Sequence, residues 1–186
     1  MTVTALDPKT ALIVIDLQKG LVALPTIHPI EEVVTHAGTM AAAFRAQGLP
    51  VVLVNVAGAP ALRTEQPRRN HVFAEGWTDL IPELNRQNDD HVVTKYTPGA
   101  FTKTDLEAYL QALGVTQIVI GGIATSNGVE VTARQAYELG FNITFAIDAI
   151  TDVDADAHAY SITRVFPKIG QTGTTGEIIA LLKRGA

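Results

Sequence analysis

The sequence predicts an α/β fold: a three-layer, doubly wound and mostly parallel sheet of six strands. Short apolar runs rich in β-branched residues alternate along the chain with longer segments that carry helix start and stop signals. The runs are continuously apolar, which is typical of parallel strands buried on both faces. Parallel strands need crossover helices, which then cover both faces of the sheet. With 186 residues, no internal repeat and no linker, residues 1–186 are expected to form one domain.

The first half of the chain supplies three of the expected strands, at residues 11–15, 49–56 and 91–95. A helix is expected from His28 to Gln47, with Gly48 as its stop signal. Residues 57–88 show no strong periodicity and contain the only tryptophan, Trp77. We expect an irregular lid or interface segment there, with Trp77 and Phe73 as wall, core or interface aromatics.

The second half continues the same alternation. Strands are expected at residues 117–120 and 141–147 and near Ile169. Helices are expected at residues 104–114, from the 121–128 junction to 139, at 155–165 and at 176–184. The sequence Thr104-Asp-Leu-Glu107 has the spacing of a capping box, and Gly114 is a stop signal.

The stretch from Gln117 to Arg134 leads from a buried strand through Gly121-Gly122 into a helix. The free N–H groups and the dipole at such a helix start favour negative charge, so the junction is a natural anion or oxyanion site. The glycine spacing does not match a nucleotide-binding fingerprint. Thr125 and Ser126 are predicted to cap the helix rather than to act as nucleophiles.

Composition excludes several function classes. The net charge is −5 and no basic stripe is visible, which argues against nucleic acid or an acidic membrane as a partner. There is no cysteine, so disulfides, thiolate metal sites and a cysteine nucleophile are excluded. The histidines lack metal-ligand spacing, and we expect neither metal nor cofactor. No signal peptide or membrane-length apolar run is present, so the cytoplasm is the expected compartment.

Two charged residues lie at the carboxyl ends of predicted strands. Asp16 comes directly after the first strand, and Lys95 ends the third. Ligands of doubly wound sheets bind beyond the carboxyl ends of the strands, so both residues and the 121–128 loop are expected to converge on one crevice. There a lysine and an aspartate tune each other's proton affinity. The structural alternative is that Asp16 caps a turn and Lys95 points into solvent.

The chain resembles the isochorismatase-like hydrolases, also called the cysteine-hydrolase or nicotinamidase-related superfamily, over nearly its whole length. The resemblance rests on the motifs at residues 11–18, 92–101, 121–134 and 135–141. It implies a catalytic aspartate at Asp16, a catalytic lysine at Lys95 and, at the family's cysteine position, Gly128. It also implies a cis peptide bond before Ala124, an oxyanion hole from the backbone N–H groups of Ala124 and Gly128, and a homo-oligomer. The candidate substrate-binding residues are Gln18, Phe101, Ile123 and Thr125.

Without the thiolate, the covalent route of the superfamily's amidases is closed. The isochorismatases proper are similar to this chain in carrying glycine there, and they cleave a vinyl ether with the aspartate as proton donor. The first hypothesis is therefore a hydrolase that acts on a small polar molecule by cysteine-independent acid–base catalysis. The alternative is a degenerate member that serves as a ligand-binding or structural homo-oligomer. A third hypothesis is that Gly128 replaces a cysteine by engineering, which assaying a Gly128→Cys variant for amidase activity would test.

Overall fold

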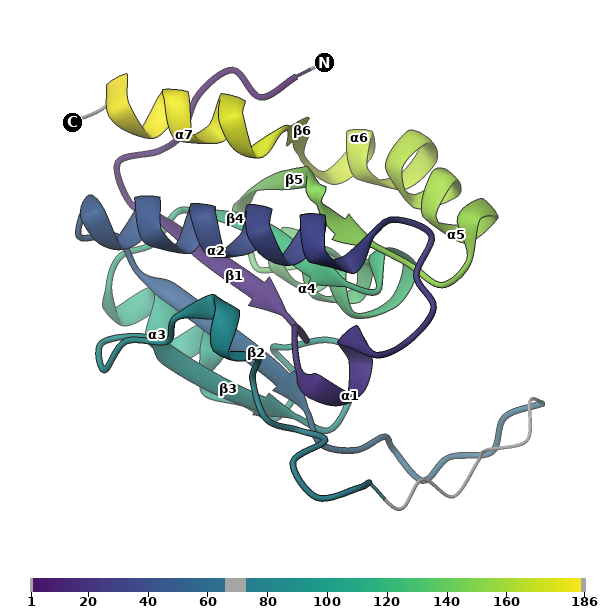
Figure 1. Cartoon of the computed structure of the whole chain (residues 1–186). Helices are drawn as coiled ribbons and strands as arrows, with labels where there is room; N and C mark the ends of the chain where they lie inside the picture. Colours follow the sequence, from purple (N-terminus) through teal and green to yellow (C-terminus); the bar gives the residue numbers. More distant parts are fainter. Residues whose placement is uncertain (1, 66–72, 185–186) are drawn as a thin grey trace.

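The structure, a computed structural model, describes residues 2–65 and 73–184 (Figure 1). Its centre is a six-stranded sheet in the order β3-β2-β1-β4-β5-β6, and every pair of neighbouring strands is parallel. The strands are β1 (Thr10–Ile15), β2 (Val51–Val56), β3 (His91–Lys95), β4 (Gln117–Ile123), β5 (Asn142–Thr151) and β6 (Gln171–Gly173). The predicted doubly wound fold is confirmed. Because the strand order reverses between β1 and β4, the switch point lies where their carboxyl ends diverge.

Helices cover both faces of this sheet. The longer ones are α2 (Ile30–Ala46), α3 (Leu106–Ala112), α4 (Glu130–Glu138) and α7 (Thr175–Arg184). The shorter ones are α1 (Lys19–Val22), α5 (Ala155–Tyr160), α6 (Phe166–Ile169) and the 3₁₀ turn η1 (Pro82–Leu84). Two π-helical turns, η2 (Thr125–Val129) and η3 (Ser161–Val165), precede α4 and α6. Helices α2 and α7 lie on one face of the sheet and α3 and α4 on the other (Figure 1).

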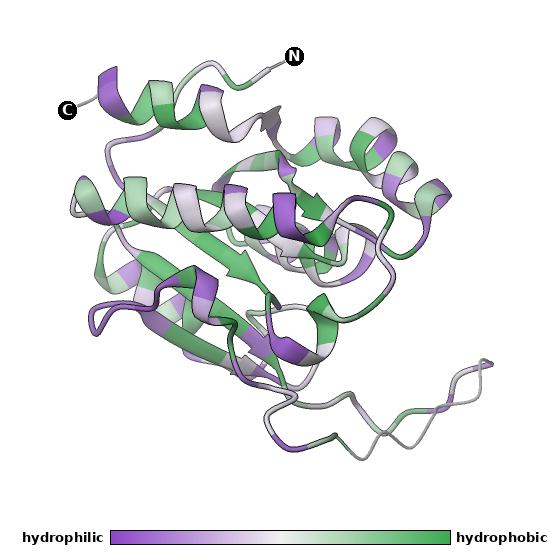
Figure 2. Cartoon of the chain, viewed as in Figure 1, coloured by the Kyte–Doolittle hydropathy of each residue, from purple (hydrophilic) through white to green (hydrophobic). Residues whose placement is uncertain are grey.

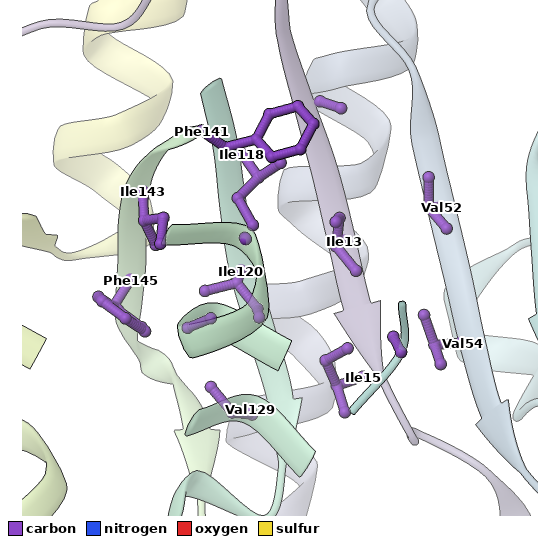
Figure 3. Packing of buried hydrophobic residues seen from close by; sticks show 14 of the residues in the cluster. Ile13, Ile15, Val52, Val54, Ile118, Ile120, Val129, Phe141, Ile143 and Phe145 are labelled. Atoms are coloured by element: carbon purple, nitrogen blue, oxygen red, sulfur yellow. The ribbon is translucent and has the colours of Figure 1, made fainter. Parts of the chain in front are cut away.

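Two apolar cores follow from this layering, one on each face. Along β1, Ile13 and Ile15 point into the core shared with α3 and α4, while Leu12 and Val14 point into the core shared with α2 and α7. Figure 3 shows the first core, which the side chains of β1, β2, β4 and β5 fill. In Figure 2 the strands are mostly hydrophobic, whereas the helices carry both kinds of residue. This is the pattern expected when a sheet is buried on both faces and each helix on one.

A glycine lets the two central strands lie close together. Gly122 has a φ of +119°, and a Cβ atom there would lie only 2.0 Å from the carbonyl oxygen of Ile15. Any other residue would therefore push β4 away from β1. The pairing of β4 with β5 shifts register between Ile120 and Gly122, and β5 continues to Thr151, beyond the predicted end at residue 147.

Local expectations about helix ends are corrected by the structure. Helix α3 begins at Leu106, with Asp105 at the N-cap position; the Thr104 hydroxyl donates to the carbonyl of Ala100 at 2.6 Å and accepts from the N–H of Leu106 at 3.4 Å. Ser126 does not cap through its own side chain; its N–H and hydroxyl both donate to Asp152, at 2.7 and 2.8 Å. Helix α1 was not predicted, and the last strand lies at residues 171–173 rather than near 169.

None of the helices formed by the described residues is long and apolar enough to cross a membrane.

Candidate active site

The candidate site lies at the switch point of the sheet. Asp16 follows β1 directly, and its N–H donates to the carbonyl of Val54 on β2 at 2.8 Å. Its backbone has a φ of +55°, in the left-handed region that aspartate tolerates better than most residues. The chain therefore turns away from the sheet at Asp16, and its carboxyl group lies beside Gly128, in the turn that follows β4.

Lys95, the last residue of β3, reaches across to this carboxyl group. Its Nζ atom lies 2.8 Å from Asp16 Oδ2, and the side chains of Lys95 and Asp16 are only 2% and 5% exposed. Lys95 Nζ also donates to the carbonyl oxygens of Pro98 at 2.8 Å and Thr97 at 3.3 Å. A buried ammonium needs such acceptors to offset its lost hydration.

The proton affinity of Asp16 reflects two opposing effects. Burial disfavours the charged carboxylate, while the Lys95 ammonium and its hydrogen bond favour it; burial prevails and raises the pKa of Asp16 to about 6. The geometry is consistent with this raised pKa, because Oδ1 of Asp16 is buried and has no hydrogen-bond partner among the described residues. A carboxyl group in this state exchanges a proton readily near neutral pH.

A cavity of about 300 Å³ opens beside this pair. It brings together five of the eight candidate residues, namely Asp16, Lys95, Ile123, Ala124 and Gly128. The peptide bond between Ile123 and Ala124 is cis, as the family resemblance implies. Residues from the loops after β1, β2, β3, β4 and β5 complete the lining.

Gly128 lies against the carboxyl group. A Cβ atom at this position would lie 3.1 Å from Asp16 Oδ2, 3.0 Å from Ile15 Cγ2 and 3.3 Å from the carbonyl oxygen of Ile123. A larger residue would therefore press directly on Asp16. The backbone of Gly128 belongs to η2, so its position is set by the π-helical turn rather than by a regular helix start.

The other three candidate residues lie outside the cavity lining. Gln18 is fully buried behind it: Oε1 accepts from the N–H of Val56 at 2.7 Å, and Nε2 donates to the carbonyls of Val56 and Trp77 at 3.0 and 3.2 Å. Phe101 packs against the core near Phe141, with ring centroids 6.1 Å apart.

Thr125, the third of these residues, is fully buried, and its Oγ1 atom lies 2.8 Å from His158 Nδ1. The rings of His158 and His28 meet edge to face at 4.9 Å. Burial and the neighbouring His28 lower the pKa of His158, with Asp152 opposing them. No group of three or more His, Asp and Glu side chains within residues 2–65 and 73–184 is arranged to hold a metal ion.

Comparison of the sequence and the fold with known proteins shows the family of this chain. The profile of the isochorismatase domain matches residues 10–177. The chain belongs to the isochorismatase family of hydrolases. Among its relatives in this family, YecD from Escherichia coli O157:H7 is 42% identical and YwoC from Bacillus subtilis 38%; these alignments cover 93% and 94% of the chain and 96% and 95% of the relatives. The solved structure of an isochorismatase family protein from Burkholderia thailandensis is 40% identical, with a TM-score of 0.92 over 96% of this chain and 98% of that one.

Several residues that line the cavity of this isochorismatase-family protein were not predicted from the sequence. Leu21, Leu24, Asn127 and Val153 all line it. Asn127 stood in the junction motif but carried no distinguishing signal, and helix α1, which bears Leu21, is too short to have a periodicity. Val153 was missed because β5 was expected to end at residue 147, before Asp148; the apolar pair Ala149 and Ile150 beyond it was the available signal.

Proposed function

We propose that this isochorismatase-family protein hydrolyses a small polar molecule by cysteine-independent acid–base catalysis, with Asp16 as the general acid. One observation carries the proposal: a carboxyl group with a pKa of about 6 forms the floor of a cavity and is ion-paired to a buried lysine. A general acid works best when its pKa lies near the working pH. No covalent intermediate is required, in keeping with glycine at position 128.

In this scheme Asp16, Lys95 and the Ala124–Gly128 backbone have separate tasks. Asp16 gives its proton to the substrate, and Lys95 holds the carboxylate that remains, at 2.8 Å. As the scissile bond breaks, the fragment that leaves keeps the proton from Asp16, and water gives its hydroxyl group to the other fragment. The remaining proton of that water returns to Asp16 and restores the acid. The backbone N–H groups of Ala124 and Gly128 are proposed to stabilise negative charge that develops on the substrate, the role of an oxyanion hole.

The substitution Asp16→Asn tests the assignment of the acid. Asparagine keeps the shape and the acceptor for Lys95 but has no acidic proton. We expect turnover of any hit from a library of small esters, amides and vinyl ethers to fall by about 10²–10⁴-fold. Asp156→Asn, on the exposed first turn of α5, is the matched control and should retain full turnover. Unchanged turnover in Asp16→Asn would rule out Asp16 as the acid.

The pH dependence gives a second, independent test. Because only protonated Asp16 is active, kcat/KM of the hit should be highest below pH 6 and should fall about tenfold per unit above it. Lys95 lowers the pKa of Asp16, so Lys95→Met should move this edge to higher pH even though the overall rate drops. An activity that rises with pH instead would mean that the ionised form is the active one.

The alternative function is a ligand-binding or structural homo-oligomer without turnover. The unusual feature that favours it is the absence of cysteine from the whole chain. Failure of the entire library to be turned over by the wild-type protein, together with saturable binding of one of its members, would favour this alternative.

A further inference from the structure

We infer that the cavity beside Asp16 takes an uncharged molecule, made of a compact apolar body and one neutral hydrogen-bonding group such as a carboxamide or an ester carbonyl. A carboxylate or phosphate group on the ligand is disfavoured. The inference rests on the proposed function, since it names the substrate class of the same site.

While Asp16 is ionised, as at pH 7.5, its charge and that of Lys95 balance each other in the part of the cavity lining that the structure describes. Asp16 and Lys95 are the only charged residues in the lining contributed by the described parts of the chain, and they are paired with each other at 2.8 Å. An anionic ligand would therefore find no unpaired cationic side chain among the described residues of the lining. It would also face the Asp16 carboxylate, which adjoins the backbone of Gly128. Burying an unpaired charge beside a like charge is strongly unfavourable.

Lys95 has no proton left to offer a ligand. An ammonium group carries three N–H donors. The three acceptors within reach of Lys95 Nζ are Asp16 Oδ2 at 2.8 Å and the carbonyl oxygens of Pro98 at 2.8 Å and Thr97 at 3.3 Å. Binding a carboxylate would require Lys95 to give up one of them.

The remaining walls suit an apolar body. They are formed largely by aliphatic side chains from the short helix α1, loops and strand ends, namely Leu21, Leu24, Val56, Ala59, Ile123 and Val153. A volume of about 300 Å³ lies at the lower end of the range for small-molecule sites, so the ligand is compact.

One uncharged polar side chain is available to fix the orientation of a ligand. The hydroxyl of Thr97 donates to the carbonyl of Gly99 at 2.9 Å, so its proton is used internally. The carboxamide of Asn127 is exposed at the cavity and makes no side-chain hydrogen bond to the described residues. An amide offers both a donor and an acceptor, which matches a neutral carbonyl or carboxamide.

Two pairs of probes with matched shape test the inference by binding alone: benzamide against benzoate, and cyclohexanecarboxamide against cyclohexanecarboxylate. Affinities are measured at pH 7.5 from ¹H–¹⁵N chemical-shift titrations of the wild-type protein, read at the backbone amides of Ala124, Asn127 and Gly128. In each pair we expect the carboxamide to bind at least tenfold more tightly. Equal or tighter binding of the carboxylates would overturn the inference, as would failure of both carboxamides to bind.

A gain-of-charge variant tests the reason. Val153 lines the cavity and is 52% exposed, so a longer side chain fits at its rim. Val153→Arg should strengthen benzoate binding at least tenfold, while Val153→Gln, the uncharged control of similar length, should leave it within threefold. Asn127→Leu should weaken both carboxamides about tenfold and leave the carboxylates unchanged. If Val153→Arg does not strengthen benzoate binding, the lack of an unpaired cation cannot be the reason that anions bind weakly, and the argument from charge is wrong.

These measurements separate this inference from the proposed function. A carboxamide preference together with turnover that does not depend on Asp16 would support the ligand class and contradict the acid–base mechanism. The converse result, turnover that requires Asp16 but a preference for the carboxylates, would contradict only the ligand class.

Discussion

The carboxyl group of Asp16 is buried beside Lys95, and its pKa rises to about 6 because burial outweighs the attraction of the ammonium. A residue that binds its proton more tightly in the folded state contributes stability at low pH. That contribution is complete below the unfolded pKa of 3.8 and is lost as the pH rises through about 6. At neutral pH the ionised Asp16 is therefore a cost to folding.

We predict that this cost appears in a comparison with Asp16→Asn. Between pH 4.5 and 7.5, the unfolding free energy of the variant should improve relative to wild type by about 2 kcal/mol, because asparagine does not titrate. Urea denaturation at several pH values measures the difference. The same comparison with Asp156→Asn should give no trend of that size. Parallel curves for wild type and Asp16→Asn would mean that the two states bind the Asp16 proton equally.

Gly128 gives a second prediction about a single residue. Alanine in place of a helical glycine usually gains about 0.5–1 kcal/mol, as expected for Gly176→Ala in α7, where a Cβ atom would meet nothing within 4 Å. At position 128 the new Cβ would crowd Ile15, Asp16 and Ile123 at 3.0–3.3 Å. We expect Gly128→Ala to be less stable than Gly176→Ala by about 1–3 kcal/mol in urea denaturation. Equal stabilisation by both substitutions would show that Asp16 moves aside without cost.

At the scale of elements, Gln18 connects the ends of β1 and β2 to the segment around Trp77. Gln18→Met keeps its size but removes hydrogen bonds to Val56 and Trp77. Because buried backbone groups then lose their partners, we predict a loss of about 2–4 kcal/mol of unfolding free energy. Gln111→Met, at an exposed glutamine of α3 whose side chain donates to Glu107, should change stability by less than about 0.5 kcal/mol. A small effect at Gln18 would mean that water replaces its amide.

The elements differ in how far sequence could predict them. The strands were predictable because parallel strands buried on both faces leave unbroken apolar runs. The π-helical turn at the junction was not, because it depends on contacts from elsewhere: Asp152 holds Ser126 from 26 residues away, and His158 holds Thr125 from 33 residues away. Local cap rules consider only neighbouring residues. They therefore predicted that Thr125 and Ser126 cap the helix, whereas their hydroxyl groups are bonded to His158 and Asp152.

At the scale of the whole molecule, the convergence of Asp16, Lys95 and the junction followed from topology. The carboxyl ends of parallel strands meet at one edge, so residues after β1, β3 and β4 had to lie near each other. The lining contributed by Leu21, Leu24 and Val153 could not be predicted in this way, because those residues lie on a short helix and in loops. Topology therefore predicts the charged floor of the cavity but not its apolar walls, which determine the class of ligand.

The central position of β1 has a consequence for hydrogen exchange. Strand β1 is hydrogen-bonded to β2 on one side and β4 on the other, and its residues are fully buried. Its amide protons should exchange only when the whole molecule unfolds, whereas those of the edge strand β6 should exchange through local opening. Mass spectrometry of deuterium uptake measures this order, and exchange of β1 as fast as β6 would contradict it. Asp16 is thus attached to the part of the protein that we expect to open most slowly, while Leu24 and Val153, which line the same cavity, belong to loops that we expect to open faster. A bound ligand should therefore be detected as slower exchange in those loops, with β1 unchanged.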